Sequence, residues 1–146
     1  MEDRKYDALK LENQLCFPLY AASREVIKKY KPFLDAVDLT YTQYITMLIL
    51  WERHSVTAKE LGEELYLDSG TLTPLLKKLE NKGLVSRKRS DEDERNLIVT
   101  LTAAGEQLKE NAQKIPQQMT KCMRLNKDEK KQLYDLLYKL LKQEEE

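Results

Sequence analysis

Apolar residues recur every three or four positions over most of the chain, which is the spacing of one face of an α-helix. Near the N-terminus, this stripe consists of Leu11, Leu15, Leu19, Ala22 and Val26. We expect the first helix to end near Tyr30, because Pro32 disfavours helical geometry at the preceding residue, and a short turn to follow over residues 32–37. Pro18 lies inside the stripe, where it would remove one backbone hydrogen bond and bend the helix.

The central part of the chain predicts three further helices. The first, over residues 40–52, has an apolar face made of Tyr44, Met47, Leu48 and Trp51. The second, over residues 58–65, begins at a capping box formed by Thr57 and Glu60. The third begins at Asp68 or Ser69 and ends at Gly83, which is a typical residue just past a helix end. Two short helices joined by residues 66–70 are the pattern of a helix-turn-helix.

The periodicity changes after Gly83. Residues 84–89 and 96–101 are rich in β-forming residues, and residues 90–94 between them are all polar, so we expect a β-hairpin with a long charged tip. A helix from Thr102 to about residue 123 should be bent or interrupted at Pro116. A last helix should follow the capping box of Asn126 and Glu129 and carry a leucine stripe over residues 133–141. The glutamates that follow should be frayed.

The order of these elements predicts a mainly α fold with a small β-hairpin wing, a winged helix-turn-helix. The chain contains no internal repeat and no linker rich in Gly, Pro or Ser, so we interpret residues 1–146 as one domain with its winged-helix core at residues 39–102.

Composition excludes several classes of protein. Of the 146 residues, 34% are charged and 41% apolar, which is too apolar for a disordered chain and too polar for a membrane protein. The first ten residues contain no apolar segment of the kind that a signal peptide needs, so we expect a cytoplasmic protein without a membrane partner. Two cysteines, Cys16 and Cys122, are too few for a disulfide framework.

Charge is balanced over the whole chain, with 25 basic and 25 acidic residues, but its distribution is uneven. Residues 71–89 contain six basic residues and one acid, Glu80; the basic residues are Lys77, Lys78, Lys82, Arg87, Lys88 and Arg89. Lysines in a helix often form only a solvated face. In a winged helix-turn-helix, however, these side chains would neutralise DNA phosphates while Ser69, Thr71 and Thr73 enter the major groove.

The polar hairpin tip ends at Arg95, which would reach a neighbouring minor groove. The tip also contains the acids Asp91, Glu92, Asp93 and Glu94, which are unsuitable neighbours for phosphate. We expect at least one of them to orient Arg95 through a charge-assisted hydrogen bond.

Several stretches closely resemble the MarR family of winged-helix regulators. They read Asp-Ser-Gly-Thr-Leu-Thr-Pro-Leu-Leu-Lys-Lys-Leu-Glu from residue 68, Gly-Leu-Val-Ser-Arg from residue 83 and Asp-Glu-Asp-Glu-Arg-Asn from residue 91. Two others, Leu-Glu-Asn-Gln-Leu-Cys-Phe from residue 11 and Leu-Thr-Tyr-Thr-Gln-Tyr from residue 39, resemble the organic-hydroperoxide-sensing, OhrR-like branch. The resemblance covers nearly the full chain, although Pro18 departs from the pattern expected after Cys-Phe.

The resemblance implies a homodimeric regulator, most often a repressor, that binds a pseudo-palindromic operator in double-stranded DNA. Residues 5–37 and 103–146 would be the dimerisation helices, and their apolar stripes fit that role. The predicted DNA-binding residues are Asp68, Ser69, Gly70, Thr71, Thr73, Pro74, Lys77, Lys78, Arg87, Lys88, Arg89 and Arg95.

Cys16 taken by itself would be an inert core residue, because free cysteine is among the most buried residue types. The resemblance instead implies that an organic hydroperoxide oxidises Cys16. It also implies that hydroxyls of Tyr30 and Tyr41, with Tyr20 as a third, hold the reactive thiol. Cys122 would then close a disulfide to Cys16 of the other subunit; otherwise an external thiol would cap Cys16. For the tyrosines, ordinary core packing is the alternative.

Two other functions remain open. A thiol peroxidase would use a reactive cysteine, but His54 is the only histidine, and we find no nucleophile pair, no phosphate loop and no metal-binding spacing. We therefore expect no enzyme activity, no metal and no cofactor. A regulator of the same family that responds to a small aromatic ligand or a partner protein would leave Cys16 with a structural role only.

Overall fold

The computed structural model describes residues 4–142. Internal contacts divide the chain into two compact units, Met1–Ile115 and Pro116–Glu146. The single-domain organisation stays a prediction. The expected fraying of the terminal glutamates lies outside the described residues. No helix within residues 4–142 is both long and apolar enough to cross a membrane.

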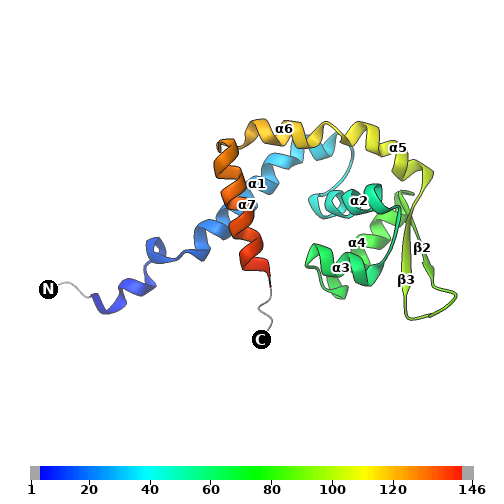
Figure 1. Cartoon of the computed structure of the whole chain (residues 1–146), viewed down its shortest axis with the longest axis horizontal. Coiled ribbons are helices and arrows are strands. Elements are labelled where there is room, and N and C mark those ends of the chain that lie inside the picture. Colours follow the sequence, from blue (N-terminus) through cyan, green and yellow to red (C-terminus); the bar gives the residue numbers. More distant parts are fainter. Residues whose placement is uncertain (1–3, 143–146) are drawn as a thin grey trace. The chain divides into compact units, whose positions relative to one another are not determined.

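The first unit contains two 3₁₀ helices, five α-helices and a small sheet (Figure 1). The helices are η1 (Arg4–Leu9), η2 (Leu11–Asn13), α1 (Cys16–Asp35), α2 (Tyr41–Arg53), α3 (Ala58–Leu65), α4 (Ser69–Asn81) and α5 (Ala103–Ala112). The strands are β1 (Ser55–Thr57), β2 (Val85–Arg89) and β3 (Leu97–Leu101), which pair antiparallel in the order β1-β3-β2. The predicted winged helix-turn-helix is confirmed.

The boundaries of the two short helices follow the predicted capping residues. Thr57 Oγ1 accepts a hydrogen bond from the Glu60 N–H at 3.1 Å, which is one half of the predicted capping box. Asp68 caps α4. Gly83 ends α4 with φ 77°, and its N–H donates to the Glu80 carbonyl while the Leu84 N–H donates to the Leu79 carbonyl. These two bonds form a Schellman motif, which fixes where the chain turns into β2.

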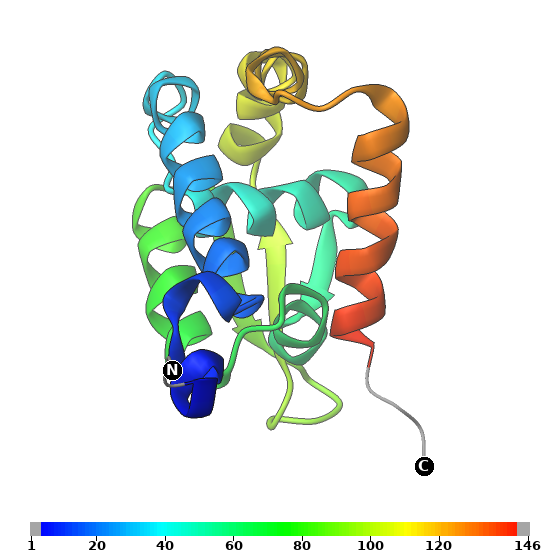
Figure 2. The same cartoon turned by 90° about the vertical axis from the view of Figure 1, so that its left-hand side faces the viewer.

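The wing is larger than the predicted hairpin. Strands β2 and β3 pair from Val85 with Leu101 to Arg89 with Leu97, and the loop that joins them protrudes beyond the rest of the winged-helix head, as Figure 1 and Figure 2 show. Strand β1, which was not predicted, pairs with β3 through Val56 opposite Val99. Three residues are too short to show an alternating pattern in the sequence.

The core of the first unit lies between α2, the helix-turn-helix and the inner side of the sheet. Its largest fully buried side chains include Met47, Leu50, Leu61, Leu76 and Leu79. Burying a leucine of this kind stabilises a fold by roughly 1.5–3 kcal/mol. The expectation that Leu48 faces the core was wrong, since this side chain is 41% exposed. The adjacent Met47 faces the core, and successive side chains on a helix point about 100° apart.

The expected limits of the first helix were also wrong. Arg4–Leu9 and Leu11–Asn13 form 3₁₀ helices, and α1 begins only at Cys16, so that Pro18 lies in its first turn, where no backbone donor is needed. At the other end, α1 passes through Pro32 and ends at Asp35. The bond lost at Pro32 would have reached the carbonyl of Lys28, and both residues lie on the exposed side of the helix.

The second unit contains α7 (Lys127–Leu141) and all but the first residue of α6 (Ile115–Cys122). Helix α5 ends at Ala112 and α6 starts at Ile115, so the predicted interruption near Pro116 is confirmed. The capping box of Asn126 and Glu129 is also confirmed, with both hydrogen bonds at 2.9 Å.

Gly105, in the first turn of α5, allows that helix to approach the chain before β2. A Cβ at this position would lie 2.3 Å from the Leu84 carbonyl oxygen and 2.6 Å from Leu101 Cδ1. We therefore expect Gly105→Ala to lower the free energy of unfolding by about 1–3 kcal/mol. Urea unfolding at fixed protein concentration measures this, followed by the fluorescence of Trp51, whose Nε1 donates to the Gly105 carbonyl at 2.8 Å.

Gly70→Ala is the matched control, because a Cβ there meets only Asp68 Oδ1 at an ordinary 3.5 Å. We expect this variant to unfold at the wild-type urea concentration or slightly above it. An equal decrease in the free energy of unfolding of Gly105→Ala and Gly70→Ala would contradict the steric explanation.

Candidate functional site

Helix α4 has an apolar face that packs against the core and a polar face that is exposed. Its inner residues Leu72, Leu75, Leu76 and Leu79 are buried. The outer residues are those predicted to bind DNA, and all are exposed: Ser69, Gly70, Thr71, Thr73, Pro74, Lys77 and Lys78. Small hydroxyl side chains therefore lie at the N-terminal end of the helix and lysines lie nearer its C-terminal end. This is the arrangement that a recognition helix requires.

Asp68 fixes the start of this helix. Its Oδ1 accepts a hydrogen bond from the Thr71 N–H at 2.8 Å. Hydrogen bonds from the backbone and side chain of Thr71 lower the pKa of the Asp68 carboxyl, so the cap stays ionised at neutral pH. An ionised cap at a helix N-terminus is stabilising.

Arg87 lies differently from the other predicted DNA-binding residues. Its Nη2 and Nε donate to Glu80 Oε1 at 3.1 and 3.3 Å, and its backbone N–H donates to Glu80 Oε2 at 3.2 Å. The side chain is only 21% exposed, and the hydrogen bond from Arg87 lowers the pKa of Glu80. This ion pair joins the last turn of α4 to the wing strand β2.

The tip of the wing has the predicted charge-assisted contact. Asp93 Oδ1 accepts hydrogen bonds from the Arg95 backbone N–H at 3.0 Å and from Arg95 Nε at 3.1 Å, and these bonds lower the pKa of Asp93. The Arg95 side chain is nevertheless 90% exposed, so its guanidinium group can still contact a bound molecule. Lys88 and Arg89 are also exposed on β2.

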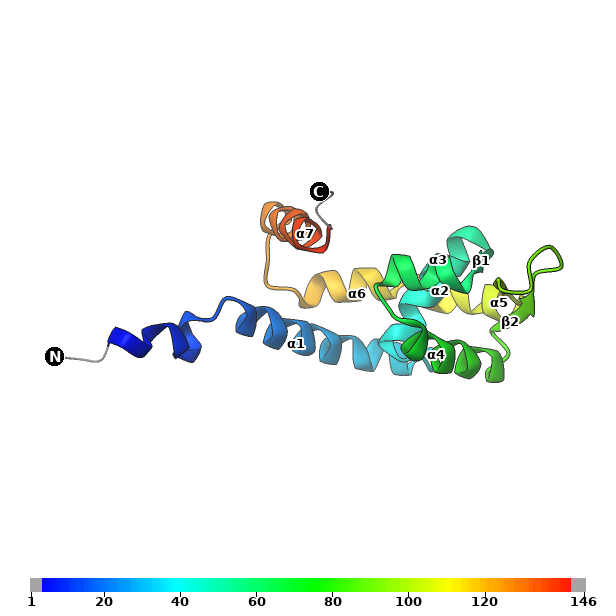
Figure 3. The same cartoon turned by 90° about the horizontal axis from the view of Figure 1, so that it is seen from below.

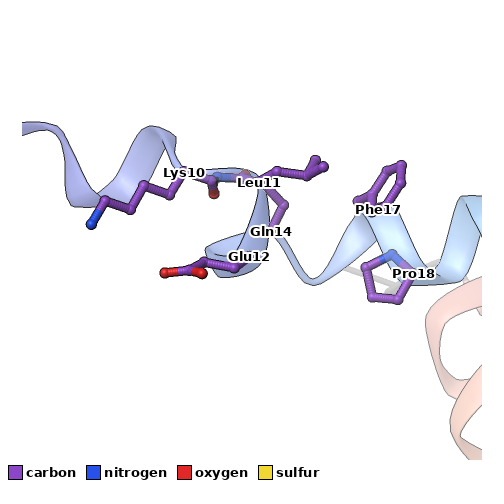
Figure 4. Close-up of a pocket in the computed structure, with 6 residues that line it drawn as sticks. All are labelled: Lys10, Leu11, Glu12, Gln14, Phe17 and Pro18. Carbon is purple, nitrogen blue, oxygen red and sulfur yellow. Dashed lines mark hydrogen bonds between the residues drawn. The ribbon is translucent and has the colours of Figure 1, made fainter.

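Cys16 is exposed and is the first residue of α1. The expectation that follows from its residue type alone, a buried core position, was therefore wrong for the single chain. Beside it, Leu11, Phe17 and Pro18 line an open groove of about 760 Å³ (Figure 4).

Tyr30 and Tyr41 lie together, but not with Cys16. Their ring centroids are 4.9 Å apart. Tyr30 follows Cys16 by 14 positions in the same helix, which corresponds to about 21 Å at a rise of about 1.5 Å per residue. Figure 3 shows the start of α1 projecting away from α2, α3 and α4, whereas its other end lies beside α2. No contact between this thiol and these hydroxyls is possible within one chain.

Tyr44 completes the aromatic cluster, although the sequence had indicated only a core position for it. Its ring centroid lies 5.9 Å from that of Tyr30 and 6.3 Å from that of Tyr41. Burial, with smaller contributions from Tyr30 and Tyr41, raises the pKa of Tyr44 to about 12, and burial also raises the pKa of Tyr30. The spacing of three between Tyr41 and Tyr44, which places both on one side of α2, was the signal in the sequence.

Tyr20, the third predicted partner, lies one helical turn after Cys16 and is exposed; its hydroxyl accepts a hydrogen bond from Arg24 Nη1 at 3.0 Å. Cys122 is the last residue of α6 and is half-buried with a free thiol.

Comparison with known proteins gives consistent matches. Residues 28–115 match the family described as transcriptional regulator SarA/Rot. The organic hydroperoxide resistance transcriptional regulator of Bacillus subtilis strain 168 is 52% identical over 139 residues, which are 95% of either chain. A structure of reduced AbfR bound to DNA is 39% identical, with a TM-score of 0.77 over 94% of this chain and 96% of that one.

A structure of disulfide-formed AbfR is 37% identical, with a TM-score of 0.62 over 97% of this chain and 96% of that one. AbfR is a protein of Staphylococcus epidermidis.

The ion pair of Glu80 and Arg87 predicts a pH-dependent contribution to stability. Because the pair lowers the pKa of Glu80 in the folded state, its contribution is complete above the ordinary carboxyl pKa of about 4.3 and is lost as pH falls through the lower folded-state value. We expect Glu80→Gln to lower the urea midpoint at pH 7, and the difference from wild type to shrink as pH falls below about 4. A difference that stays constant down to acid pH would contradict this assignment.

Proposed function

The chain belongs to the SarA/Rot family of transcriptional regulators, which shares the winged helix-turn-helix of MarR proteins, and we propose that it is a DNA-binding repressor that organic hydroperoxides switch through Cys16. The observation that carries the proposal is the 52% identity, over nearly the full chain, to the organic hydroperoxide resistance regulator. Because this is a family of transcription regulators, the alternative of a peroxidase is set aside.

The proposed DNA complex uses α4 and the wing. Ser69, Thr71 and Thr73 approach base edges in the major groove, while Lys77 and Lys78 neutralise phosphates. Lys88 and Arg89 extend the phosphate contacts along β2. Arg95, which Asp93 orients, enters the adjacent minor groove. Arg87 contributes by holding the wing against α4 rather than by binding DNA itself.

The active form in this proposal is a homodimer on a pseudo-palindromic operator. Both units expose more apolar surface than a monomer usually tolerates. On the first unit the exposed side chains include Tyr6, Leu9, Leu11, Leu15, Phe17, Leu19, Tyr20 and Ile27. On the second unit they are Leu133, Tyr134, Leu136, Tyr138, Leu140 and Leu141. A two-fold axis would bury both sets against their equivalents and present two recognition helices to two half-sites.

The dimer also supplies the partners of the thiol. Since about 21 Å separate Cys16 from Tyr30 along one helix, we place Cys16 beside Tyr30 and Tyr41 of the second subunit. An antiparallel pairing of the two α1 helices brings the start of one beside the end of the other. Tyr20 takes part from the same helix as Cys16.

The proposed chemistry begins with attack of the Cys16 thiolate on the hydroxyl oxygen of the hydroperoxide. An S–O bond forms and the O–O bond breaks; sulfur loses two electrons, and the leaving alkoxide takes a proton to become an alcohol. The sulfenic acid then reacts with the Cys122 thiol of the other subunit, which forms a disulfide and releases water. The structure of disulfide-formed AbfR supports this second step.

Because the proposed partner is DNA, the proposal includes a cytoplasmic location for the protein.

The test uses duplex DNA that the reduced protein selects from a random-sequence pool, with cumene hydroperoxide as oxidant. We expect oxidation to weaken binding of the wild type by about 5- to 150-fold and to leave Cys16→Ser bound. A dimer-sized band on a non-reducing gel should require both Cys16 and Cys122. Release of Cys16→Ser by the oxidant, or failure of the wild type to respond, would contradict the proposal and favour a regulator that answers to a small aromatic ligand or a partner protein.

Mixed dimers test whether the tyrosines act across subunits. One subunit carries Cys16→Ser and the other carries Tyr30→Phe with Tyr41→Phe. If the contact is between subunits, the one remaining thiol faces intact tyrosines and reacts with hydroperoxide at the wild-type rate. If the contact is within a subunit, that thiol faces phenylalanines, so a rate as slow as that of the Tyr30→Phe, Tyr41→Phe homodimer would overturn our assignment.

A further inference from the structure

Lys82 belongs to the basic run of the sequence, but its ammonium group is held by the protein itself. Lys82 is the C-cap of α4, and its Nζ donates to the Asp38 carbonyl and to Gln43 Oε1, the latter at 3.1 Å. The Asp38 carboxylate lies 3.7 Å away. These acceptors lie at the corner between α1 and α2, so the side chain ties the end of α4 to that corner.

Gln43 is a buried residue whose amide group has two functions. Its Oε1 accepts from the Thr40 N–H at 3.0 Å as well as from Lys82, and its backbone N–H donates to Thr40 Oγ1 at 3.3 Å. The two hydrogen bonds between Thr40 and Gln43 form the capping box that fixes the first turn of α2. That turn carries Tyr41 and leads directly to Tyr44.

Asp38 adds a second constraint to the same corner. Its φ of 55° lies in the left-handed region, which residues other than glycine rarely adopt. Such a conformation persists only where neighbouring contacts hold it, and Lys82 binds the carbonyl of this residue. Backbone hydrogen bonds from the Asp38 and Leu39 N–H groups to the Asp35 and Leu34 carbonyls also hold this corner, and Lys82 is the contact that joins it to α4.

The last turn of α4 is thus attached on two sides. Lys82 joins it to the corner that carries Tyr41, and Glu80 joins it to Arg87 on the wing. A displacement of Tyr30 or Tyr41 would shift the first turn of α2, and the Lys82 contacts would pass this shift to the recognition helix and to the wing.

We propose that Lys82 is a positioning residue that couples the oxidation state of Cys16 to DNA binding. The proposal rests on the function proposed above, and it assigns Lys82 a role other than phosphate neutralisation. Its side chain is 31% exposed, and its ammonium group is directed to Asp38 and Gln43 by the hydrogen bonds described above.

The test compares the ratio of dissociation constants for the selected duplex between oxidised and reduced full-length protein. The variants are Lys82→Met, which removes the donors, and Lys82→Arg, which retains charge and donors. We expect Lys82→Met to reduce the ratio by about 2- to 30-fold and Lys82→Arg to restore most of it. Lys77→Met, in the same helix, should weaken both forms, lower the salt dependence and leave the ratio unchanged.

The outcomes separate the possible roles of Lys82. A wild-type ratio in Lys82→Met overturns the inference, whether or not affinity falls, because a phosphate contact weakens both forms equally. If Lys82→Met does not fold, the ratio is read from Lys82→Gln, whose shorter side chain cannot reach all three acceptors, and an unchanged ratio there also overturns the inference. If the oxidised and reduced wild-type proteins bind the duplex with the same dissociation constant, the proposed function itself is contradicted.

Discussion

The length of α1 determines where the thiol chemistry of this protein can occur. A continuous helix from Cys16 to Asp35 is rigid, and it holds the cysteine about 21 Å from Tyr30. The continuity depends on the positions of the two prolines. Pro18 falls in the first turn, where a helix needs no donor, and Pro32 faces solvent near the last turn. A break at either position would have removed this fixed separation, whereas the continuous helix makes a second subunit necessary for the proposed sensor.

The same helix explains why the thiol and the apolar surface have to be considered together. Exposed Cys16 lies among exposed Leu15, Phe17 and Leu19, and this surface is costly in water. Dimerisation would bury the apolar side chains and at the same time enclose the cysteine near the tyrosines of the second subunit. One physical requirement, the removal of apolar surface from water, would therefore assemble the proposed sensor and set the spacing of the two recognition helices.

The sequence contained the information for most of the fold, because local signals determine helix ends. Thr57, Asp68 and Gly83 marked the boundaries of α3 and α4, and each forms the expected hydrogen bond or φ angle. Strand β1 could not be predicted, since it is defined by its backbone pairing with β3. The partners of Arg87 and Lys82 were equally hidden, because a run of basic residues shows charge but not direction. Only tertiary contacts distinguish the lysines that face solvent from the one that binds the α1–α2 corner.

The energetics of a switch place a limit on what Lys82 can do alone. A net hydrogen bond within a protein contributes about 0.5–1.5 kcal/mol, or somewhat more when one group is charged. A 100-fold change in DNA affinity requires about 2.7 kcal/mol. In a symmetric dimer, however, each operator complex would contain two Lys82 corners, and their contributions would add if both subunits shift together. Two modest contacts per dimer would then supply a large part of the coupling, and the symmetry that the operator requires would also amplify the signal from the thiol.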